Sequence, residues 1–263
     1  MRQKPKKSLG QNFLVDKNIQ RKIIAACAFK PEDIVLEIGA GRGELSCSIA
    51  ERVAKIYALE IDPSLCQIIE ERLGNYKNAR IINKDILEFN LRRYFSRYKD
   101  KIKVVGNIPY YITSPIIEHL LVYRDKIDSV FLTVQKEFAL RMTASAGVRE
   151  YGSFSCFVQY YTEARKIFFI KRNCFYPVPG VDSCFLRLGI REKPALELKD
   201  ERLFFRIIRA AFGKRRKTLR NSLRGVIAQG KLKRFFTQYD IDEDIRPEEL
   251  TLKEFANLAN AQG

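Results

Sequence analysis

The feature that most constrains the fold of this chain is a strand, glycine turn, helix and strand in immediate succession. Ile34–Ile38 is a short apolar run typical of a buried parallel strand. Gly39-Ala40-Gly41-Arg42-Gly43 follows it directly, and from Glu44 onward apolar side chains recur at helical spacing. A second apolar run over residues 56–61 completes the unit. We therefore expect a βαβ unit and an α/β fold built on a parallel sheet.

The glycine turn predicts a site where the backbone approaches a ligand closely. Gly39 and Gly41 carry no Cβ, so the chain can pass against a bound molecule there. Glu60 comes at the end of the second strand, where an acid can accept hydrogen bonds from ribose hydroxyls. Glu44 at the start of the helix is a poor host for a pyrophosphate, because it is negative. S-adenosylmethionine, which has no phosphate, therefore fits better than a dinucleotide.

Two further strands end in polar residues. The apolar stretch that starts at Ala79 ends at Asp85, which either accepts a hydrogen bond from an adenine amino group or caps a turn or helix. The next strand, over residues 101–106, ends at Asn107. The carboxyl ends of parallel strands meet at one edge of a sheet. We therefore expect four consecutive strands to bring together Gly39, Glu60, Asp85 and Asn107.

Residues 107–110 read Asn-Ile-Pro-Tyr and predict a stiff turn. Ile108 precedes a proline, so it is held extended and its carbonyl is left free to point outward. Pro109 fixes the turn, and Tyr110 places an aromatic face just beyond it. Two acceptors beside a flat ring suit the exocyclic amino group of a planar base. An Asn-x-Pro turn can also simply end a strand, and the coincidence with the other strand ends favours the binding interpretation.

The composition of the chain limits which binding partners and which catalytic mechanisms are expected. The net charge is +17 with a pI near 9.7, which favours a polyanion, and nucleic acid in particular. The six cysteines are scattered and His119 is the only histidine, so we expect neither a metal site nor histidine-based catalysis. No apolar run or leader suggests a membrane span or secretion. Scattered cysteines suit the cytoplasm.

The second half of the chain predicts three more strands and then a change of composition. The strands are expected near residues 129–134, 166–170 and 182–188, and the composition shifts near residue 190. From Glu201 to Arg224 a helical pattern carries cations and no acid after Glu201. This charge is either a solvated face or a phosphate-binding surface, and its single sign favours the latter. The candidate RNA-binding residues are Arg209, Lys214, Arg215, Arg216, Lys217 and Arg220.

Three local signals complete the reading of the chain. Asp16 and Thr251 are predicted to cap helices, the latter through a capping box with Glu254. Phe13 and Leu14 are large apolar residues that we expect to be buried, although the basic residues before them are compatible with a disordered tail. Phe175 lies in a stiff proline-rich loop, and it is either an exposed aromatic or a core phenylalanine.

Taken in order, these motifs resemble the KsgA (RsmA) family of small-subunit ribosomal RNA adenine N6,N6-dimethyltransferases. The resemblance covers nearly the whole chain. The segments that carry it are Gln11-Asn12-Phe13-Leu14, Glu37 to Gly43, Glu60-Ile61-Asp62, Gly106 to Tyr110, Gln135-Lys136-Glu137, Phe175 to Ser183 and Ala211 to Leu223.

The resemblance implies a fold and a division into domains. The fold is a class I S-adenosylmethionine-dependent methyltransferase, Rossmann-like, with a mostly parallel seven-stranded sheet whose last strand is antiparallel. A small all-α domain follows it. We expect the methyltransferase domain, with its N-terminal basic segment, over residues 1–190. The helical rRNA-binding domain is expected over residues 191–263.

The resemblance also implies a substrate and a set of site residues. The substrate is a pair of adjacent adenosines in the 3′-terminal hairpin of 16S rRNA, within the immature small subunit, and the protein is expected to act as a monomer. Asn107, Ile108, Pro109 and Tyr110 belong to the catalytic motif, and Phe175 packs on the flipped base. The S-adenosyl-L-methionine site is lined by Asn12, Leu14, Gly39, Glu60, Asp85 and Asn107.

Two alternatives remain open at this point. Erm-type methyltransferases of large-subunit (23S) rRNA share the cofactor half and the Asn-Ile-Pro-Tyr motif, but Gln135-Lys136-Glu137 resembles the small-subunit enzymes. A ribosome-assembly factor, or a transcription factor of the related mitochondrial type, would use catalysis only secondarily. One departure from the family pattern is Tyr111, where the family usually has Asn, followed by Thr113 and Ser114 in swapped order.

Overall fold

The computed structural model describes residues 5–6, 9–214 and 216–262, which form two compact units. The first, here the sheet unit, comprises Met1–Ala139 and Arg165–Ile190. The second, here the helical unit, comprises Leu140–Ala164 and Arg191–Gly263. The sequence predicts one boundary at residue 190. The chain also passes between the units near residues 139 and 164, because α7 (Ser153–Tyr161) packs with helix α8 (Glu201–Phe212) of the C-terminal part.

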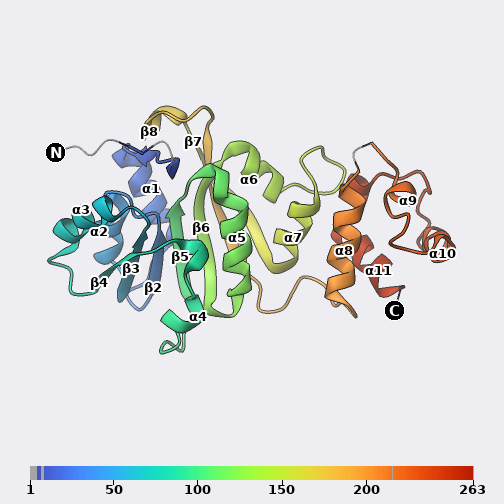
Figure 1. The fold of residues 1–263 in the computed structure, drawn as a ribbon, viewed down its shortest axis with the longest axis horizontal. Coiled ribbons are helices and arrows are strands. Elements are labelled where there is room, and N and C mark those ends of the chain that lie inside the picture. The colour runs from blue at the N-terminus through green and yellow to red at the C-terminus, as the bar shows by residue number, and fades with distance from the viewer. Residues whose placement is uncertain (1–4, 7–8, 215, 263) are drawn as a thin grey trace. The chain divides into compact units, whose positions relative to one another are not determined.

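A seven-stranded sheet is the framework of the sheet unit, in the order β4-β3-β2-β5-β6-β9-β7 (Figure 1). The pairs β2–β3, β2–β5, β3–β4 and β5–β6 are parallel, and β9 runs antiparallel to β6. This confirms the predicted α/β fold with an antiparallel last strand. The strands are β2 (Ile34–Ile38), β3 (Lys55–Glu60), β4 (Ala79–Asn83), β5 (Ile102–Asn107), β6 (Ile127–Gln135), β7 (Thr162–Ile170) and β9 (Ser183–Ile190).

Helices follow the strands as the predicted βαβ pattern requires. Those of the first half are α1 (Lys17–Cys27), α2 (Glu44–Ala50), α3 (Pro63–Leu73), the single turn α4 (Leu91–Tyr94), α5 (Thr113–Val122) and α6 (Lys136–Met142). Those that follow α7 are α8 (Glu201–Phe212), α9 (Leu219–Ser222), α10 (Gln229–Tyr239) and α11 (Leu252–Asn260).

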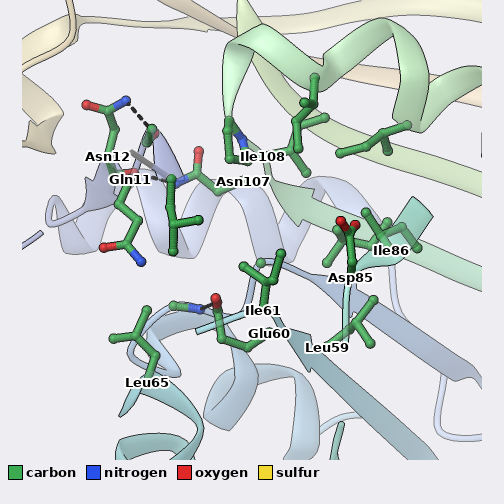
Figure 2. A pocket seen from close by; sticks show the side chains of 18 of the residues that line it. Gln11, Asn12, Leu59, Glu60, Ile61, Leu65, Asp85, Ile86, Asn107 and Ile108 are labelled. Carbon is green, nitrogen blue, oxygen red and sulfur yellow. Dashed lines mark hydrogen bonds between the residues drawn. The ribbon is translucent and has the colours of Figure 1, made fainter. Parts of the chain in front are cut away.

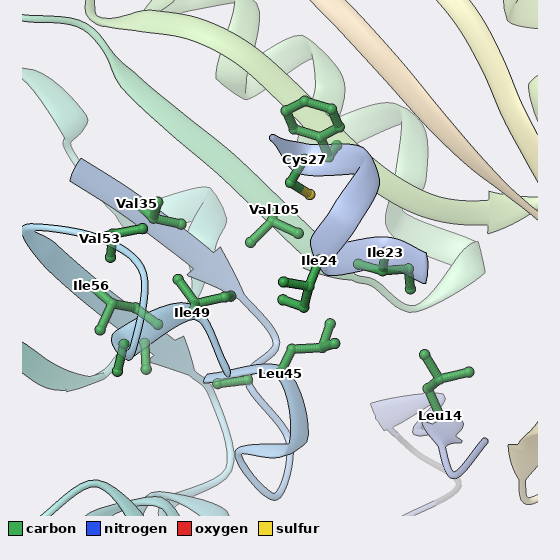
Figure 3. Packing of buried hydrophobic residues seen from close by; sticks show 14 of the residues in the cluster. Leu14, Ile23, Ile24, Cys27, Val35, Leu45, Ile49, Val53, Ile56 and Val105 are labelled. Carbon is green, nitrogen blue, oxygen red and sulfur yellow. The ribbon is translucent and has the colours of Figure 1, made fainter. Parts of the chain in front are cut away.

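Alternating strand residues build the core that holds these elements together. Val35, Ile56 and Val105 come from three neighbouring strands and are at most 1% exposed. They pack in one cluster with Ile24 of α1 and Ile49 of α2, as Figure 3 shows. Burial of this apolar surface stabilises the sheet and so fixes the edge at which its strands end.

Helix starts agree with the predicted caps, whereas the long basic helix does not form. Asp16 accepts hydrogen bonds from the first backbone amides of α1, and Thr251 forms the predicted capping box. The pattern over residues 201–224 predicts one helix, but α8 ends at Phe212 and a separate turn, α9, begins at Leu219. Arg216 between them has a φ of +63°, which no right-handed helix accommodates.

A two-stranded sheet ties the N-terminal segment to a distant loop. β1 (Phe13–Leu14) pairs antiparallel with β8 (Phe175–Tyr176), with Phe13 opposite Tyr176 and Leu14 opposite Phe175. Phe13 and Leu14 are 7% and 5% exposed, which confirms that they are buried. This pairing holds the preceding residues 9–12 beside the carboxyl ends of the central strands.

Candidate functional site

A cavity of about 330 Å³ opens at the carboxyl ends of β2, β3, β4 and β5 (Figure 2). The N-terminal residues 9–13 form part of its wall. The structure therefore brings together nine of the residues that the sequence singles out. These nine are Asn12, Gly39, Gly41, Glu60, Asp85, Asn107, Ile108, Pro109 and Tyr110.

Two glycines shape the floor of this cavity. Gly39 and Gly41 have φ values of +68° and +62°, a left-handed conformation that favours glycine. A Cβ on Gly39 would lie 3.4 Å from the main-chain oxygen of Asn107, across the cavity floor. The Gly41 amide donates to Glu60 Oε2 over 2.9 Å. The glycine turn thus keeps the space open and fixes the neighbouring acid.

Glu60 is a buried carboxylate whose two oxygens are held by the backbone. Oε2 accepts from Gly41, and Oε1 accepts from the Asp62 amide at 3.0 Å. Burial raises the pKa of Glu60, and these hydrogen bonds oppose the rise. Each carboxylate oxygen can accept more than one hydrogen bond. Glu60 is therefore a positioned acceptor that can still receive hydroxyl donors from a ligand.

Asp85 forms the cap that was one of its two expected roles, and one of its oxygens stays available for the other. Its Oδ1 accepts from the Leu87 amide at 2.9 Å and caps a short 3-10 turn, Ile86–Glu88. Its Oδ2 has no hydrogen-bond partner within the described part of the chain. The cap fixes the side chain in the cavity wall, where Figure 2 shows it, and leaves one oxygen for a donor on a ligand.

Asn107 is oriented by the N-terminal segment. Its Nδ2 donates to the main-chain oxygen of Asn12 at 2.8 Å. Because that oxygen can only accept, the amide has one possible orientation. Asn107 Oδ1 and the Ile108 carbonyl oxygen make no hydrogen bond to any described residue. The cavity thus contains two acceptors without partners at the end of β5, which can receive the two hydrogens of an amino group.

Two tyrosines follow these acceptors and behave differently. The Tyr110 hydroxyl shares a hydrogen bond of 2.6 Å with Ser183 Oγ on β9, and burial raises its pKa. This bond holds the Tyr110 ring in the cavity wall. Tyr111 is 65% exposed, and its ring lies against Gly10 at the cavity wall. A fixed ring beside two acceptors is an arrangement that can bind a flat heterocyclic amine.

The N-terminal segment is fastened to the site by contacts that sequence reasoning missed. Lys6 Nζ donates to Asp62 Oδ1 at 2.8 Å, and Gln11 Nε2 donates to Asp62 Oδ2 at 3.2 Å. Burial alone would raise the pKa of Asp62, but the bonds from Lys6, Ser64 and Gln11 lower it below its ordinary value. The basic start at Lys6 is therefore not simply a free tail. The only sequence signal for Asp62 was its place after Glu60.

A second buried acid lies beneath the glycine turn. Glu37 is 2% exposed, and the Ser46 hydroxyl donates to its Oε2 at 2.5 Å. Burial raises the pKa of Glu37 to about 8, and the negative charges of Glu44 and Glu60 add to the rise. Near neutral pH the protonated form of Glu37 therefore predominates.

Leu14 and Phe175 are not at the cavity, contrary to expectation. Phe175 is 2% exposed and packs with Leu14 in the core cluster, because the β1–β8 pairing turns both side chains inward. The alternative of a core phenylalanine describes Phe175 in this structure. The exposed aromatic of that loop is Tyr176, at 57%.

The described cations of the basic segment are all exposed, and one of them is already paired. Arg209, Lys214, Arg216 and Lys217 are exposed, and Arg215 lies outside the described residues. Arg220, by contrast, donates to Glu243 Oε2 at 2.7 Å. The acidic stretch after α10 folds back on this cation, which the sequence pattern alone did not reveal.

Within residues 5–6, 9–214 and 216–262, no cluster of His, Cys, Asp and Glu side chains is arranged to hold a metal ion. No helix of these residues is both long and apolar enough to cross a membrane.

The chain was compared with known families and proteins. The family model described as ribosomal RNA adenine dimethylase matches residues 2–262. A protein of Geobacillus sp. (strain WCH70), named ribosomal RNA small subunit methyltransferase A, is 44% identical over 97% of this chain and 91% of its own length. A protein of the same name from Bacillus mycoides (strain KBAB4) is 41% identical over 97% of this chain and 90% of its own length.

Two solved structures share the fold along most of the chain. A dimethyladenosine transferase from Plasmodium falciparum is 26% identical, with a TM-score of 0.78 over 94% of this chain and 95% of that one. The 23S rRNA methyltransferase ErmE is 24% identical, with a TM-score of 0.77 over 95% of this chain and 99% of that one. At this identity the likeness to ErmE concerns the fold alone.

Proposed function

The chain belongs to the ribosomal RNA adenine dimethylase family, and we propose that it methylates N6 of two adjacent adenosines in the 3′-terminal hairpin of 16S rRNA. The methyl donor is S-adenosylmethionine, and each product is N6,N6-dimethyladenosine. The observation that carries this proposal is the pair of acceptors without partners, Asn107 Oδ1 and the Ile108 carbonyl, at the end of β5. They match the two hydrogens of an adenine amino group.

The residues of the cavity fit S-adenosylmethionine. The turn at Gly39 and Gly41 leaves room that a Cβ would fill, and no phosphate has to approach Glu44. Glu60 can accept from ribose hydroxyls, and Asp85 Oδ2 can accept from the adenine amino group. When bound, this cofactor supplies a methyl group on a positively charged sulfonium, which the acidic residues around the turn suit.

Methyl transfer requires a nucleophilic nitrogen, and adenine N6 is a poor one because its lone pair is delocalised into the ring. Asn107 Oδ1 and the Ile108 oxygen would each accept one N–H of the amine and favour a pyramidal nitrogen. The lone pair would then point toward the methyl group. Pro109 fixes the spacing of the two acceptors through the turn. Positioning and electrostatics of this kind can supply most of the acceleration.

The target base must leave its stack to reach the cavity. Tyr110, held by Ser183, offers a ring on which the base can stack, and such stacking is worth about 1–3 kcal/mol per base. This offsets part of the cost of unstacking. With Phe175 buried in the core, we assign the stacking role to Tyr110.

We propose that the two units have different roles. The sheet unit would bind the cofactor and the target base. The exposed cations of the helical unit would contact RNA phosphates. These cations are Arg209, Lys214, Arg216 and Lys217. A surface whose charges are all positive favours binding of a polyanion, which supports this role. Arg220 is the weaker candidate, because Glu243 already neutralises it.

The proposal is tested with purified ribosomal subunits from cells that lack both adenosine modifications. Small and large subunits are incubated separately with the protein and methyl-labelled S-adenosylmethionine, and the labelled nucleoside is identified after digestion. We expect dimethyladenosine from the small subunit alone. Label in the large subunit would indicate an Erm-type activity. Binding of the small subunit without any label would indicate an assembly factor.

A further inference from the structure

A second groove of the sheet unit is lined by four cations, and no described residue in its lining is a carboxylate. It has a volume of about 490 Å³ and lies between β3, β4 and the segment around α4. Arg80, Lys84, Arg93 and Arg97 line it, together with Tyr57 and Tyr94. We call it the α4 groove. Tyr57 and Arg80 are direct partners across β3 and β4, so both side chains emerge on the same face of the sheet.

Arg97 is held in this groove without being neutralised. Its Nη2 donates to the Tyr57 hydroxyl at 2.5 Å and to the Tyr98 hydroxyl at 3.0 Å. Its guanidinium carbon lies 4.9 Å from the centre of the Tyr98 ring. Hydroxyl groups and aromatic faces orient a guanidinium but leave its charge in place. Arg97 is therefore a positioned cation in a groove whose described lining residues carry no negative charge.

Arg80, Lys84 and Arg93, like Arg97, form no ion pair with a described residue, and the side chains of the first three make no hydrogen bond to one. The adjacent residue of α4 shows the contrast. Arg92 pairs with Asp125 at 3.0 Å and also donates to the Val122 carbonyl. One arginine of this short helix is thus neutralised, and the next one projects into the α4 groove.

The α4 groove adjoins the candidate active site. Lys84 lines both cavities, and Asp85, which follows it, belongs to the wall of the first. A chain that lay along the groove would therefore reach the edge of the cavity at the end of β4, beside Asp85. Four cations in one groove match the phosphodiester backbone of RNA.

We propose that the α4 groove binds backbone phosphates of the RNA substrate, as an RNA contact additional to the basic segment of the helical unit. This inference rests on the proposed function, because the RNA in question is the one to be methylated. A free nucleotide or inorganic phosphate offers the same chemistry, and the test separates these sources from RNA.

The test uses the full-length double variant Arg80→Gln/Arg93→Gln. Its matched control is Arg21→Gln/Arg52→Gln, which likewise removes two positive charges, but from another groove of the sheet unit. In that groove Arg52 is already paired with Glu51. Affinity for immature small subunits is measured over a range of salt concentrations, with KM and kcat for methylation. Affinity for S-adenosylmethionine is measured in parallel, and so is binding of inorganic phosphate and ATP.

Loss of two phosphate contacts should lower the slope of log affinity against log salt by about 2 and weaken binding at least about tenfold at 0.1 M salt. We expect KM for the subunit to rise with kcat and cofactor affinity unchanged, and the control to behave as the wild type. Equal losses in both double variants would overturn the proposal. So would loss of phosphate or ATP binding with an unaltered salt slope.

Failure of this inference differs from failure of the proposed function. If the wild-type protein methylates small subunits and the groove variant binds them normally, the groove assignment is wrong and the proposed function still holds. If the wild type methylates neither subunit, the proposed function falls, and an unchanged salt slope for the groove variant in the binding assay would then overturn the groove assignment as well.

Discussion

The side-chain nitrogen of Asn107 donates to the main-chain oxygen of Asn12 at 2.8 Å, which joins the end of β5 to a segment 95 residues earlier in the chain. This bond fixes the amide of Asn107 so that its oxygen is left for a donor in the cavity. The N-terminal segment thus completes the site as well as covering it. The same segment is fastened a second time, where Gln11 and Lys6 meet Asp62.

The placement of that segment depends on Gly10. Its φ is +59°, and a Cβ there would lie 2.9 Å from Tyr111 Cε1 and 3.3 Å from Pro109 Cβ. Gly10→Ala should therefore displace the segment and lower kcat/KM at least about tenfold. The matched control is Gly147→Ala, whose φ of +88° carries a similar backbone cost but whose Cβ meets nothing within 4 Å. Equal activity of the two variants would contradict this account.

The stability of the protein should depend on the protonation of Glu37. In the native state the pKa of Glu37 is about 8, against 4.5 for the ordinary group. Between these values the native state keeps a proton that the unfolded state loses. Stability is therefore fully present below about pH 4.5, falls as the pH rises toward 8, and levels off above it.

Glu37→Gln removes this titration and keeps a partner for Ser46. We expect the stability of the variant relative to wild type to increase from pH 5 to pH 8, by at most about 1.4 kcal/mol per pH unit. Thermal unfolding at several pH values measures it. Parallel pH profiles for the two proteins would show that Glu37 is ionised in the native state.

The exposed cations after α8 should contribute to RNA binding through phosphates. Arg216→Gln/Lys217→Gln should lower the salt slope of small-subunit binding by about 2. Arg220→Gln should change the slope by much less than 1, because Glu243 already neutralises that side chain. Filter binding over a series of salt concentrations compares them. A larger effect of Arg220→Gln than of the double variant would refute this ranking.

The parts of this site that the sequence predicted are those whose pattern lies within one short segment of the chain. Gly39, Glu60, Asp85 and Asn107 were expected together, because each follows a short apolar strand and parallel strands end at one edge. The structure brings these four to one cavity. Local patterns also predicted the cap at Asp16 and the box at Thr251.

Contacts between distant segments were not predictable in the same way. Phe175 is buried because β8 pairs with β1, which lies about 160 residues earlier, and nothing in its own loop encodes that pairing. The Lys6–Asp62 and Arg220–Glu243 ion pairs likewise depend on tertiary structure. The break after Phe212 falls at a glycine amid closely spaced cations, where helical periodicity continues although the helix does not.

The central claim is that Asn107 acts on the amine of the target base, and single-turnover methylation by Asn107→Ala tests it most directly. Immature small subunits and S-adenosylmethionine are supplied at saturation, and the affinity of the variant for each is measured separately. We predict a fall in the rate of methyl transfer of at least about a hundredfold, with small-subunit affinity retained. A rate within a few-fold of the wild type would contradict the assignment of Asn107 and with it the proposed mechanism.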